Sequence, residues 1–476
     1  MSLTYLLLLL ATILVAVAAM AAAYRRSRDP LHPLLIACPI VLFVYVAQPW
    51  VLQGDRRTDW FVPMADMERV QAIFVCIFAA FCAGALAASG RARWRAPAEP
   101  FRLPPRMSRR LLVAAVVVGV AGLVSWGLLV GWEGGVGQVY DQPHGGDALH
   151  PEGWVRETTR LALVGVVLAL AASRARRASA LALLFAAPQL VHAALGTRRG
   201  PAFVGAVLLV GGWYVFQGRR PRLWATLAGG AGLGLLILLL LANRYRVYYG
   251  SEAPITLDLT DSYAFYANTG NDYLVAAGLV VAADRTGTFG WGRSYVEQLF
   301  LRPIPRSVLP NKYDIIDEKT MTSEDIASTL GWEPPPGWSP TLFAHLYTEF
   351  SWLAVGVAAL LGAAYGWTWR RAVESAALGW LMVQVLMMAG ILHLFAQEVW
   401  AMAVPFLLTL APTWLAMRLA LGPIFGPRAP RPLPPSTEMW PAPESGAPAS
   451  PARSDRGGRP KAVGGLGLSR SGGPPA

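Results

Sequence analysis

Long apolar segments separated by short polar connections dominate the chain from Leu3 to Leu421. Each segment approaches the ~20 apolar residues that an α-helix needs to cross the hydrocarbon core of a bilayer. The pattern predicts about 11 membrane-spanning helices. Their expected ranges are 3–23, 33–52, 69–89, 111–131, 157–173, 179–196, 201–217, 223–243, 344–367, 376–396 and 399–421.

Arginine is distributed unevenly among the connections. Five alternate connections are basic, and the positive-inside rule assigns them to the cytoplasm. They are YRRSR (24–28), GRARWRAPAEPFRLPPRMSRR (90–110), SRARR (173–177), QGRRPR (217–222) and WRR (369–371). Arg56 and Arg57, which fall on the outer side, are the exception. We therefore predict a multi-pass protein of the cytoplasmic (inner) membrane, with its N-terminus outside and its C-terminus in the cytoplasm.

The first segment, LTYLLLLLATILVAVAAMAAA, resembles a signal peptide with a small-residue cleavage site. It lacks a basic region in front of the apolar run, and YRRSR follows it directly. These features favour a first membrane span over a cleaved signal.

Composition agrees with a membrane protein. Of the 476 residues, 54% are hydrophobic and 15% are charged, whereas soluble domains carry about 25% charged residues. The net charge of +12 does not indicate nucleic acid, because the arginines lie between apolar runs and in the tail, where they set topology. Cys38, Cys76 and Cys82 fall inside apolar segments without a CxxC pair, so neither a disulfide framework nor a zinc site is expected.

Two long segments lie outside the expected spans. The outer loop 244–343 is far longer than a connection without a function usually is. Within it, the apolar stretch Tyr273–Ala283 is short for a span and predicts an interfacial or re-entrant helix. From Gly422 the chain is rich in Pro, Gly and Ser. We predict a helical membrane domain over 1–421 and a disordered cytoplasmic tail over 422–476.

Charged residues gather on the outer side of this topology, where arginine needs a reason to be present. Guanidinium groups bind phosphates in a bidentate manner, so a lipid-linked pyrophosphate is a fitting ligand. Alternatively, some of these arginines pair with nearby carboxylates or reach lipid headgroups. The basic set is Arg198, Arg199, Arg244, Arg246, Arg285, Arg293, Arg302, Arg306 and Lys312, and the acidic or proton-accepting set includes Asp272, Glu297, His345 and Glu349.

The connection GTRRGP (196–201) is the sharpest case. Gly196 and Gly200 permit a tight turn, and Pro201 suits the first turn of a helix. Arg199 is thus expected at or just before a helix N-terminus, where backbone N–H groups also favour an anion. The acidic segment DIIDEKTMTSED in the large loop lacks the spacing of a divalent-cation site, so no metal is predicted.

Four pieces in this order resemble the Wzy-type O-antigen and polysaccharide polymerases. They are GTRRGP, FGWGRSYVEQLFLRPIPRSVLPNKY, GWEPPPGWSP and TLFAHLYTEFSWLAVG, and the resemblance covers about residues 180–370. Two positions depart from the family: His345 stands where Glu is usual, and Ser351 stands where Gly is usual. An Arg followed ten residues later by Gly, described for some members, is absent from both outer loops.

The resemblance implies a GT-C-like helical architecture and a glycosyl transfer on the outer face of the membrane. A growing glycan on undecaprenyl pyrophosphate would be transferred to a new lipid-linked repeat unit, with no nucleotide sugar, cofactor or metal. The implied partners are the undecaprenyl-pyrophosphate-linked oligosaccharide, membrane lipid, a chain-length regulator and a flippase. Three alternatives stay open: an O-antigen-type ligase or other lipid-linked-sugar glycosyltransferase, a lipid-linked glycan flippase or transporter, and a membrane scaffold without catalytic activity.

Such a transfer needs a proton acceptor for the attacking hydroxyl and cations for the departing pyrophosphate. For the base we expect His345 and, as second choice, Glu349 one turn further along the same helix. For the pyrophosphates we expect Arg198, Arg199, Arg244 and Arg306, with Arg246, Arg293 and Lys312 as second choices.

Overall fold

Helices make up all the regular structure among the described residues of the computed structural model, which contain no strand. The structure describes residues 2–50, 62–94, 103–132, 134–136, 153–172, 176–195, 199–242, 272–301, 304, 308–309, 311, 323–333, 340–375, 377–397 and 399–424. All of these belong to one unit, Met1–Arg428. Nearly all of the expected tail lies outside the described residues, so its disorder stays a prediction.

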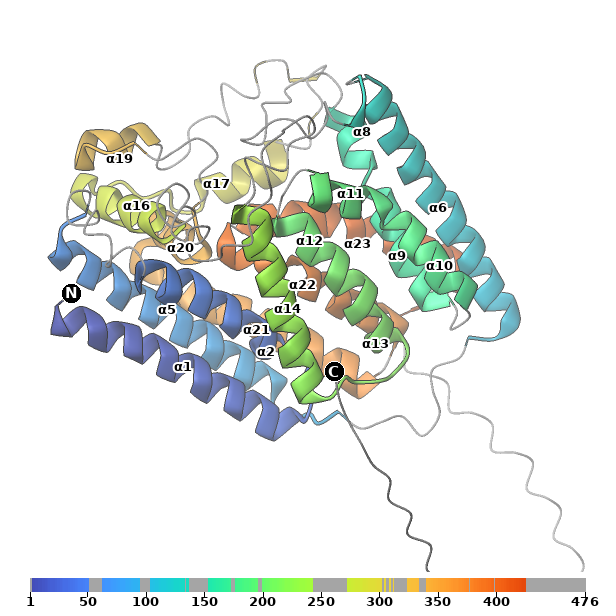
Figure 1. Cartoon of the computed structure of the whole chain (residues 1–476), viewed down its shortest axis with the longest axis horizontal. Coiled ribbons are helices and arrows are strands. Elements are labelled where there is room, and N and C mark those ends of the chain that lie inside the picture. Colours follow the sequence, from blue (N-terminus) through green and yellow to red (C-terminus); the bar gives the residue numbers. More distant parts are fainter. Residues whose placement is uncertain are drawn as a thin grey trace, which may run out of the picture. The chain divides into compact units, whose positions relative to one another are not determined.

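Seven helices in this part of the chain are long and apolar enough to cross a membrane, which confirms the class of polytopic helical membrane protein. They correspond to α1 (Leu3–Ser27), α2 (Pro33–Leu42) with the π-helix η1 (Phe43–Ala47), α5 (Met64–Ser89), α6 (Pro105–Trp132), α20 (Leu342–Phe350) with α21 (Ala354–Ser375), α22 (Leu378–Ala396) and α23 (Val399–Leu421) (Figure 1). The first span, α1, packs into the core through Tyr5, Leu9 and Ala16.

The four spans expected between 157 and 243 are shorter or interrupted. They correspond to α8 (Gly153–Thr158) and α9 (Leu161–Ala172); α10 (Arg176–Phe185) and α11 (Ala187–Leu195); α12 (Arg199–Ala206), the π-helix η2 (Val207–Gly211) and α13 (Gly212–Phe216); and α14 (Leu223–Ala242). Pro188 explains the break between α10 and α11, because it has no backbone N–H to donate to the carbonyl oxygen of Leu184 and its ring crowds that carbonyl. The number of 11 spans therefore stays a prediction.

Helices α5 and α21 lie side by side and approach each other unusually closely (Figure 1). A Cβ atom added to Gly362 would lie 2.0 Å from the carbonyl oxygen of Phe81, and one added to Gly366 would lie 2.2 Å from that of Ala85. In return, a Cβ on Gly84 would lie 2.0 Å from the carbonyl oxygen of Ala359. Small residues four apart bring two backbones together in this way in membrane helices, where close van der Waals packing drives association.

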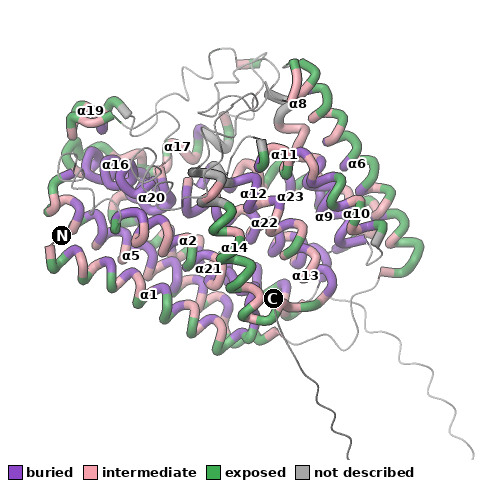
Figure 2. Tube along the Cα trace, viewed as in Figure 1, coloured by how far each residue is buried: buried purple, intermediate pink, exposed green. Residues whose placement is uncertain are grey.

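The large loop also contains helices: α16 (Asp272–Thr286), α17 (Arg293–Val296), the π-helix η3 (Glu297–Leu301) and α19 (Ser323–Leu330). Helix α16 contains the apolar stretch expected to be interfacial or re-entrant, and it is buried from Asp272 to Ala283 (Figure 2). Its 15 residues span about 22 Å, less than the ~30 Å hydrocarbon core. It packs against α19 and α20 at the end of the bundle where α1 begins (Figure 1).

The basic connections meet at the opposite end of the bundle around Asp29, whose side chain is 0% exposed. Its carboxylate accepts hydrogen bonds from Arg220 Nε at 2.8 Å, Trp369 Nε1 at 2.9 Å and the backbone N–H of Leu31 at 2.9 Å. The guanidinium of Arg220, 5% exposed, also lies over the ring of Trp94 at 5.4 Å. Four of the five connections expected on one side of the membrane are thus in mutual contact.

His32 borders this cluster. Its Nδ1 accepts the backbone N–H of Leu34 at 3.3 Å and so caps the start of α2. Its ring lies 4.6 Å, centroid to centroid, from the ring of Trp369. Burial lowers the pKa of His32 to about 4, and the nearby charge of Asp29 only partly opposes this.

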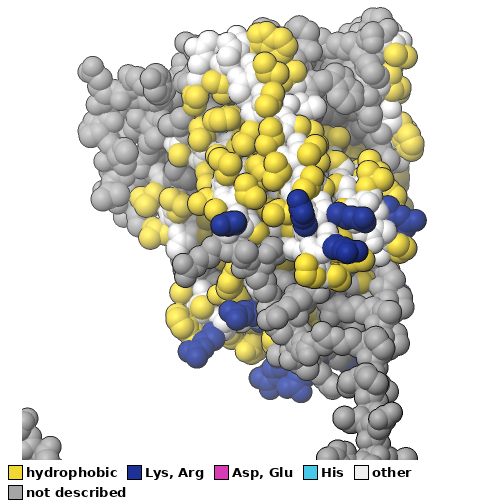
Figure 3. Space-filling model, turned by 90° about the vertical axis from the view of Figure 1, so that its right-hand side faces the viewer, with side chains coloured by type: hydrophobic (Ala, Val, Ile, Leu, Met, Phe, Trp, Pro, Cys, Tyr) yellow, Lys and Arg dark blue, Asp and Glu magenta, His cyan; other side chains and the backbone are white. Residues whose placement is uncertain are grey.

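One side of the molecule has the character of a lipid-facing surface. Figure 3 shows a broad hydrophobic field with arginines gathered toward one end and no acidic side chain or histidine coloured among the described residues in view. Helix α6 lies on this side, with Val113, Val117, Val120, Val124 and Leu128 exposed. The N-terminal part of the same helix carries exposed Arg106, Arg109 and Arg110. This order of residues fits a membrane core followed by its boundary.

Candidate functional site

The predicted catalytic residues lie on α20, at the end of the bundle remote from the basic connections. His345 and Glu349 are one turn apart on this helix, as expected, and both are nearly buried, with 7% and 1% of their surface exposed. Helix α20 ends at Phe350 because the next residue, Ser351, has a φ of 50°. This break divides the expected span 344–367 into α20 and α21, and it fixes the end of α20 beside the turn 290–292.

Glu349 holds the turn of the FGWGRSY segment. Its carboxylate accepts the backbone N–H of Gly292 at 3.1 Å, and the N–H of Gly290 donates to the carbonyl oxygen of Thr348 at 3.0 Å. The turn needs a left-handed backbone at both Trp291, with a φ of 51°, and Gly292, with a φ of 83°. Glu349 therefore positions α17, because its carboxylate is committed to the residue that precedes that helix.

His345 belongs to an aromatic cluster with Tyr295 of α17. The Tyr295 hydroxyl and His345 Nδ1 are 3.3 Å apart. The ring of Tyr295 lies 5.4 Å from that of His345, 5.4 Å from that of Phe350 and 4.9 Å from that of Trp400 of α23, measured between centroids. The cluster joins the large loop, α20 and α23, three segments that are far apart in the sequence.

Two polar atoms in this neighbourhood are buried without a hydrogen-bond partner among the described residues. They are Nε1 of Trp400 and Oγ of Ser294. Buried polar groups in proteins nearly always have a partner, and an exception calls for an explanation such as a missing ligand or water. A donor indole and a hydroxyl beside a histidine are suited to a hydroxyl-rich ligand.

Arg293 is the one predicted pyrophosphate ligand whose side chain is described. Its Nε lies 2.6 Å from Oε1 of Glu297, one turn further along, and its side chain is 57% exposed whereas that of Glu297 is 9% exposed. The pairing matches the alternative stated for the outer arginines. An exposed guanidinium on one side of a buried carboxylate can still present N–H groups to an anion.

Further ion pairs tie α16 to α5 at this end of the bundle. Arg285 binds Asp66 at 2.7 Å, and Arg69 binds Asp284 at 2.9 Å. The hydroxyl of Tyr347 on α20 donates to Asp284 at 2.9 Å. Arg285 is therefore engaged in an ion pair that holds α16 against α5. Together, these contacts fix the position of α16 at this end of the bundle.

The structure describes only part of the GTRRGP connection. Helix α12 begins at Arg199, as expected, although the side chain of Arg199 is outside the described residues. Gly200 packs against α22, since a Cβ there would lie 2.5 Å from Nε2 of His393. The other expected ligands lie outside the described residues and stay predictions: Arg198, Arg244, Arg246, Arg306 and Lys312.

Another buried hydrogen-bond network lies at the N-terminal end of α16. The side-chain amide of Gln48 donates to Asp272 at 3.3 Å and accepts the backbone N–H of Tyr273 at 3.1 Å. The hydroxyl of Tyr5 donates to that of Tyr273 at 2.9 Å. Asp272, one of the acidic residues expected on the outer side, thus anchors the start of α16 to the end of the second span.

Sequence reasoning did not find Tyr295, Ser294 or Trp400. Tyr295 and Ser294 lie inside the quoted FGWGRSY segment, where a polar or aromatic residue has no distinguishing spacing. Trp400 begins a span, where a tryptophan is ordinary at a membrane boundary. Within the described ranges, no group of three or more His, Cys, Asp or Glu side chains is placed to hold a metal ion.

Compared with known proteins, the chain matches no protein-family model, no curated protein and no solved structure.

Proposed function

We propose that the chain is a membrane glycosyltransferase that acts on lipid-linked glycans, and specifically that it polymerises undecaprenyl-pyrophosphate-linked repeat units on the outer face of the cytoplasmic membrane. The observation that carries the proposal is the pair of His345 and Tyr295 beside the indole N–H of Trp400, which has no hydrogen-bond partner among the described residues. A potential base and a potential donor then lie together at the end of the bundle remote from the basic connections.

In the proposed reaction, a sugar hydroxyl oxygen of the acceptor attacks the anomeric carbon of the lipid-linked donor. The bond from that carbon to the pyrophosphate oxygen breaks, and the pyrophosphate leaves with the electron pair. His345 accepts the hydroxyl proton. Arg293 and the predicted cations outside the described residues stabilise the charge that develops on the pyrophosphate.

Tyr295 then has a positioning role. A neutral imidazole has one donor and one acceptor nitrogen. If Nδ1–H of His345 donates to the Tyr295 hydroxyl across their 3.3 Å separation, Nε2 carries the lone pair that takes the proton. Glu349, whose carboxylate holds Gly292, is better suited to fixing α17 than to accepting a proton.

Three functional classes leave three different intermediates in cells that lack the protein. Loss of a polymerase leaves single repeat units on the lipid carrier at the outer face. Loss of a ligase leaves finished polymer on the carrier. Loss of a flippase leaves single units on the inner face, where only inside-out vesicles expose them to a membrane-impermeant probe. After gene deletion, mass spectrometry of the carrier-linked glycans separates single units from finished polymer, and the impermeant probe separates the outer face from the inner face. Only single units at the outer face support polymerisation.

Variants test the site itself in the complemented deletion strain. We expect His345→Ala to abolish polymer formation, and Tyr295→Phe to lower it by about 10–100-fold through the loss of a positioned base. Tyr347→Phe is the matched control. It also removes a tyrosine hydroxyl at this end of the bundle, but that hydroxyl donates to Asp284 and not to His345. Full activity of His345→Ala at normal protein abundance would remove that residue as the base.

A further inference from the structure

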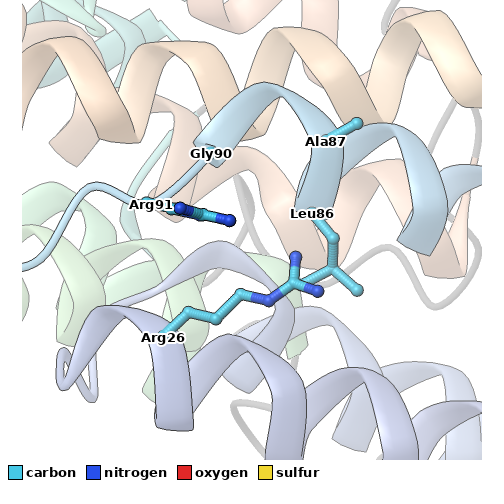
Figure 4. A pocket seen from close by; sticks show the side chains of 5 residues that line it. All are labelled: Arg26, Leu86, Ala87, Gly90 and Arg91. Carbon is cyan, nitrogen blue, oxygen red and sulfur yellow. The ribbon is translucent and has the colours of Figure 1, made fainter.

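A cavity of about 530 Å³ lies at the basic end of the bundle, between the C-terminal ends of α1 and α5. It is lined by Arg26, Leu86, Ala87, Gly90 and Arg91. Figure 4 shows the two guanidinium groups converging on this space, that of Arg26 from α1 and that of Arg91 from the end of α5. The cavity is remote from the aromatic cluster of His345 and Tyr295.

The lining combines positive charge with an apolar wall. None of the five lining residues is acidic, and no ion pair joins Arg26 or Arg91 to an acidic side chain in the part of the chain that is described. A third guanidinium borders the site, since a Cβ on Gly90 would lie 3.4 Å from Nη1 of Arg370, which itself binds Glu374 at 2.8 Å. Two guanidinium groups without an acidic partner among the described residues fit the oxygens of one phosphate.

The surroundings indicate that the phosphate belongs to a lipid. Both helices that form the cavity are long and apolar enough to span a membrane. On α5, the exposed residues Cys76, Ala83 and Ala87 lie on one face, which ends at the cavity. A headgroup held by the arginines would therefore have apolar helix surface beside it for its acyl chains. Basic pockets between spanning helices bind anionic headgroups for this reason.

We propose that this cavity binds the phosphate of an anionic lipid headgroup. The assignment does not depend on the proposed enzymatic function, because it uses only residues at the other end of the bundle. Two sources of phosphate share this chemistry, an anionic phospholipid and free inorganic phosphate, and the experiment separates them.

The test uses the purified full-length chain in a zwitterionic detergent, titrated with phosphatidylglycerol and, in a second arm, with inorganic phosphate. Native mass spectrometry counts the bound lipid and gives its affinity. We expect the double variant Arg26→Gln, Arg91→Gln to bind phosphatidylglycerol about 30-fold more weakly. Inorganic phosphate alone should bind more weakly than the lipid, because it lacks the acyl chains.

Two further variants distinguish a specific binding site from nonspecific attraction to a basic surface. Arg25→Gln with Arg93→Gln removes the same charge from the same two segments but from residues that do not line the cavity, and should change the affinity less than about threefold. Ala87→Phe keeps both arginines and fills the space, so the tight binding should be lost. The proposal would be overturned by equal weakening in both double variants, by undiminished binding to Ala87→Phe, or by a protein that binds inorganic phosphate but not phosphatidylglycerol.

Discussion

The buried carboxylate of Asp29 gives the clearest test of how the basic end of the bundle is held together. The substitution Asp29→Asn keeps the shape of the side chain and removes its charge. One of the two oxygens becomes an NH₂ group, which cannot accept from Arg220 Nε or from Trp369 Nε1. The guanidinium of Arg220, 5% exposed, then loses its counter-charge in a place that water reaches poorly.

The size of the effect follows from burial. Removing one partner of a buried ion pair costs about 3–5 kcal/mol because the other charge stays buried and unpaired. That is a large part of the ~5–15 kcal/mol by which a folded domain is stable. Replacing Arg220 by Met in the Asp29→Asn background removes the stranded charge as well and should recover at least half of the loss.

The pair of Arg370 and Glu374 is a matched control at the same end of the molecule. Its N–O distance is also 2.8 Å, but its side chains are 46% and 44% exposed. Glu374→Gln makes the same chemical change and should cost only ~0–1 kcal/mol. Unfolding in mixed detergent micelles, followed by tryptophan fluorescence, gives the free energies of unfolding. Equal losses in Asp29→Asn and Glu374→Gln would refute the view that burial decides the strength of the Asp29 cluster.

Three other expectations concern stability and use the same unfolding assay. His32 should make the protein less stable as pH falls. Its pKa of about 4 in the folded state lies below the ~6.5 of an unfolded histidine, so the unfolded chain takes up a proton first. About 3 kcal/mol of the free energy of unfolding is therefore lost between pH 6.5 and 4. His32→Gln should flatten this window, and an unchanged pH dependence would contradict the assignment. Ser351→Gly should stabilise the protein by about 1 kcal/mol because Ser351 has a φ of 50°, whereas Ser351→Ala should not. Gly362→Ala should cost at least ~1–3 kcal/mol by separating α5 from α21, whereas Gly356→Ala, which meets no atom within 4 Å, should be neutral or slightly stabilising.

The hydrophobic pattern predicts the class of protein well, and the arginine pattern correctly groups four of the five basic connections at one end of the bundle. The sequences of the basic connections do not show which connections contact each other. In the structure, Asp29 contacts Arg220 and Trp369, and these contacts bring three of the connections together. Span boundaries were predicted less well where short apolar helices follow one another. A break such as that near Pro188, or the turn at Ser351, depends on one residue that a hydropathy average over a whole span does not detect.

Within the candidate site, helical spacing alone was enough to place His345 and Glu349 on one helix. The different tasks of the two residues could not be predicted, because they depend on Gly292 and Tyr295, which are about fifty residues away in the sequence and reach α20 only through the turn at 290–292. The burial of the Trp400 indole N–H without a hydrogen-bond partner among the described residues is likewise a consequence of packing. Charge patterning proposed many cations for the ligand, but it cannot show which of them, like Arg285, are already engaged by a carboxylate.

The Asp29 cluster also constrains the order in which the protein is assembled. Arg220 and Trp369 follow Asp29 by 191 and 340 residues in the chain. At a synthesis rate of about 5–20 residues per second, these partners emerge from the ribosome roughly 10–40 s and 20–70 s later. Until then the carboxylate has to stay in contact with water or with the insertion machinery. The junction between α1 and α2 is therefore synthesised early but completed only after α21 has been made, so a nascent chain that stops before α21 leaves the Asp29 carboxylate without Trp369.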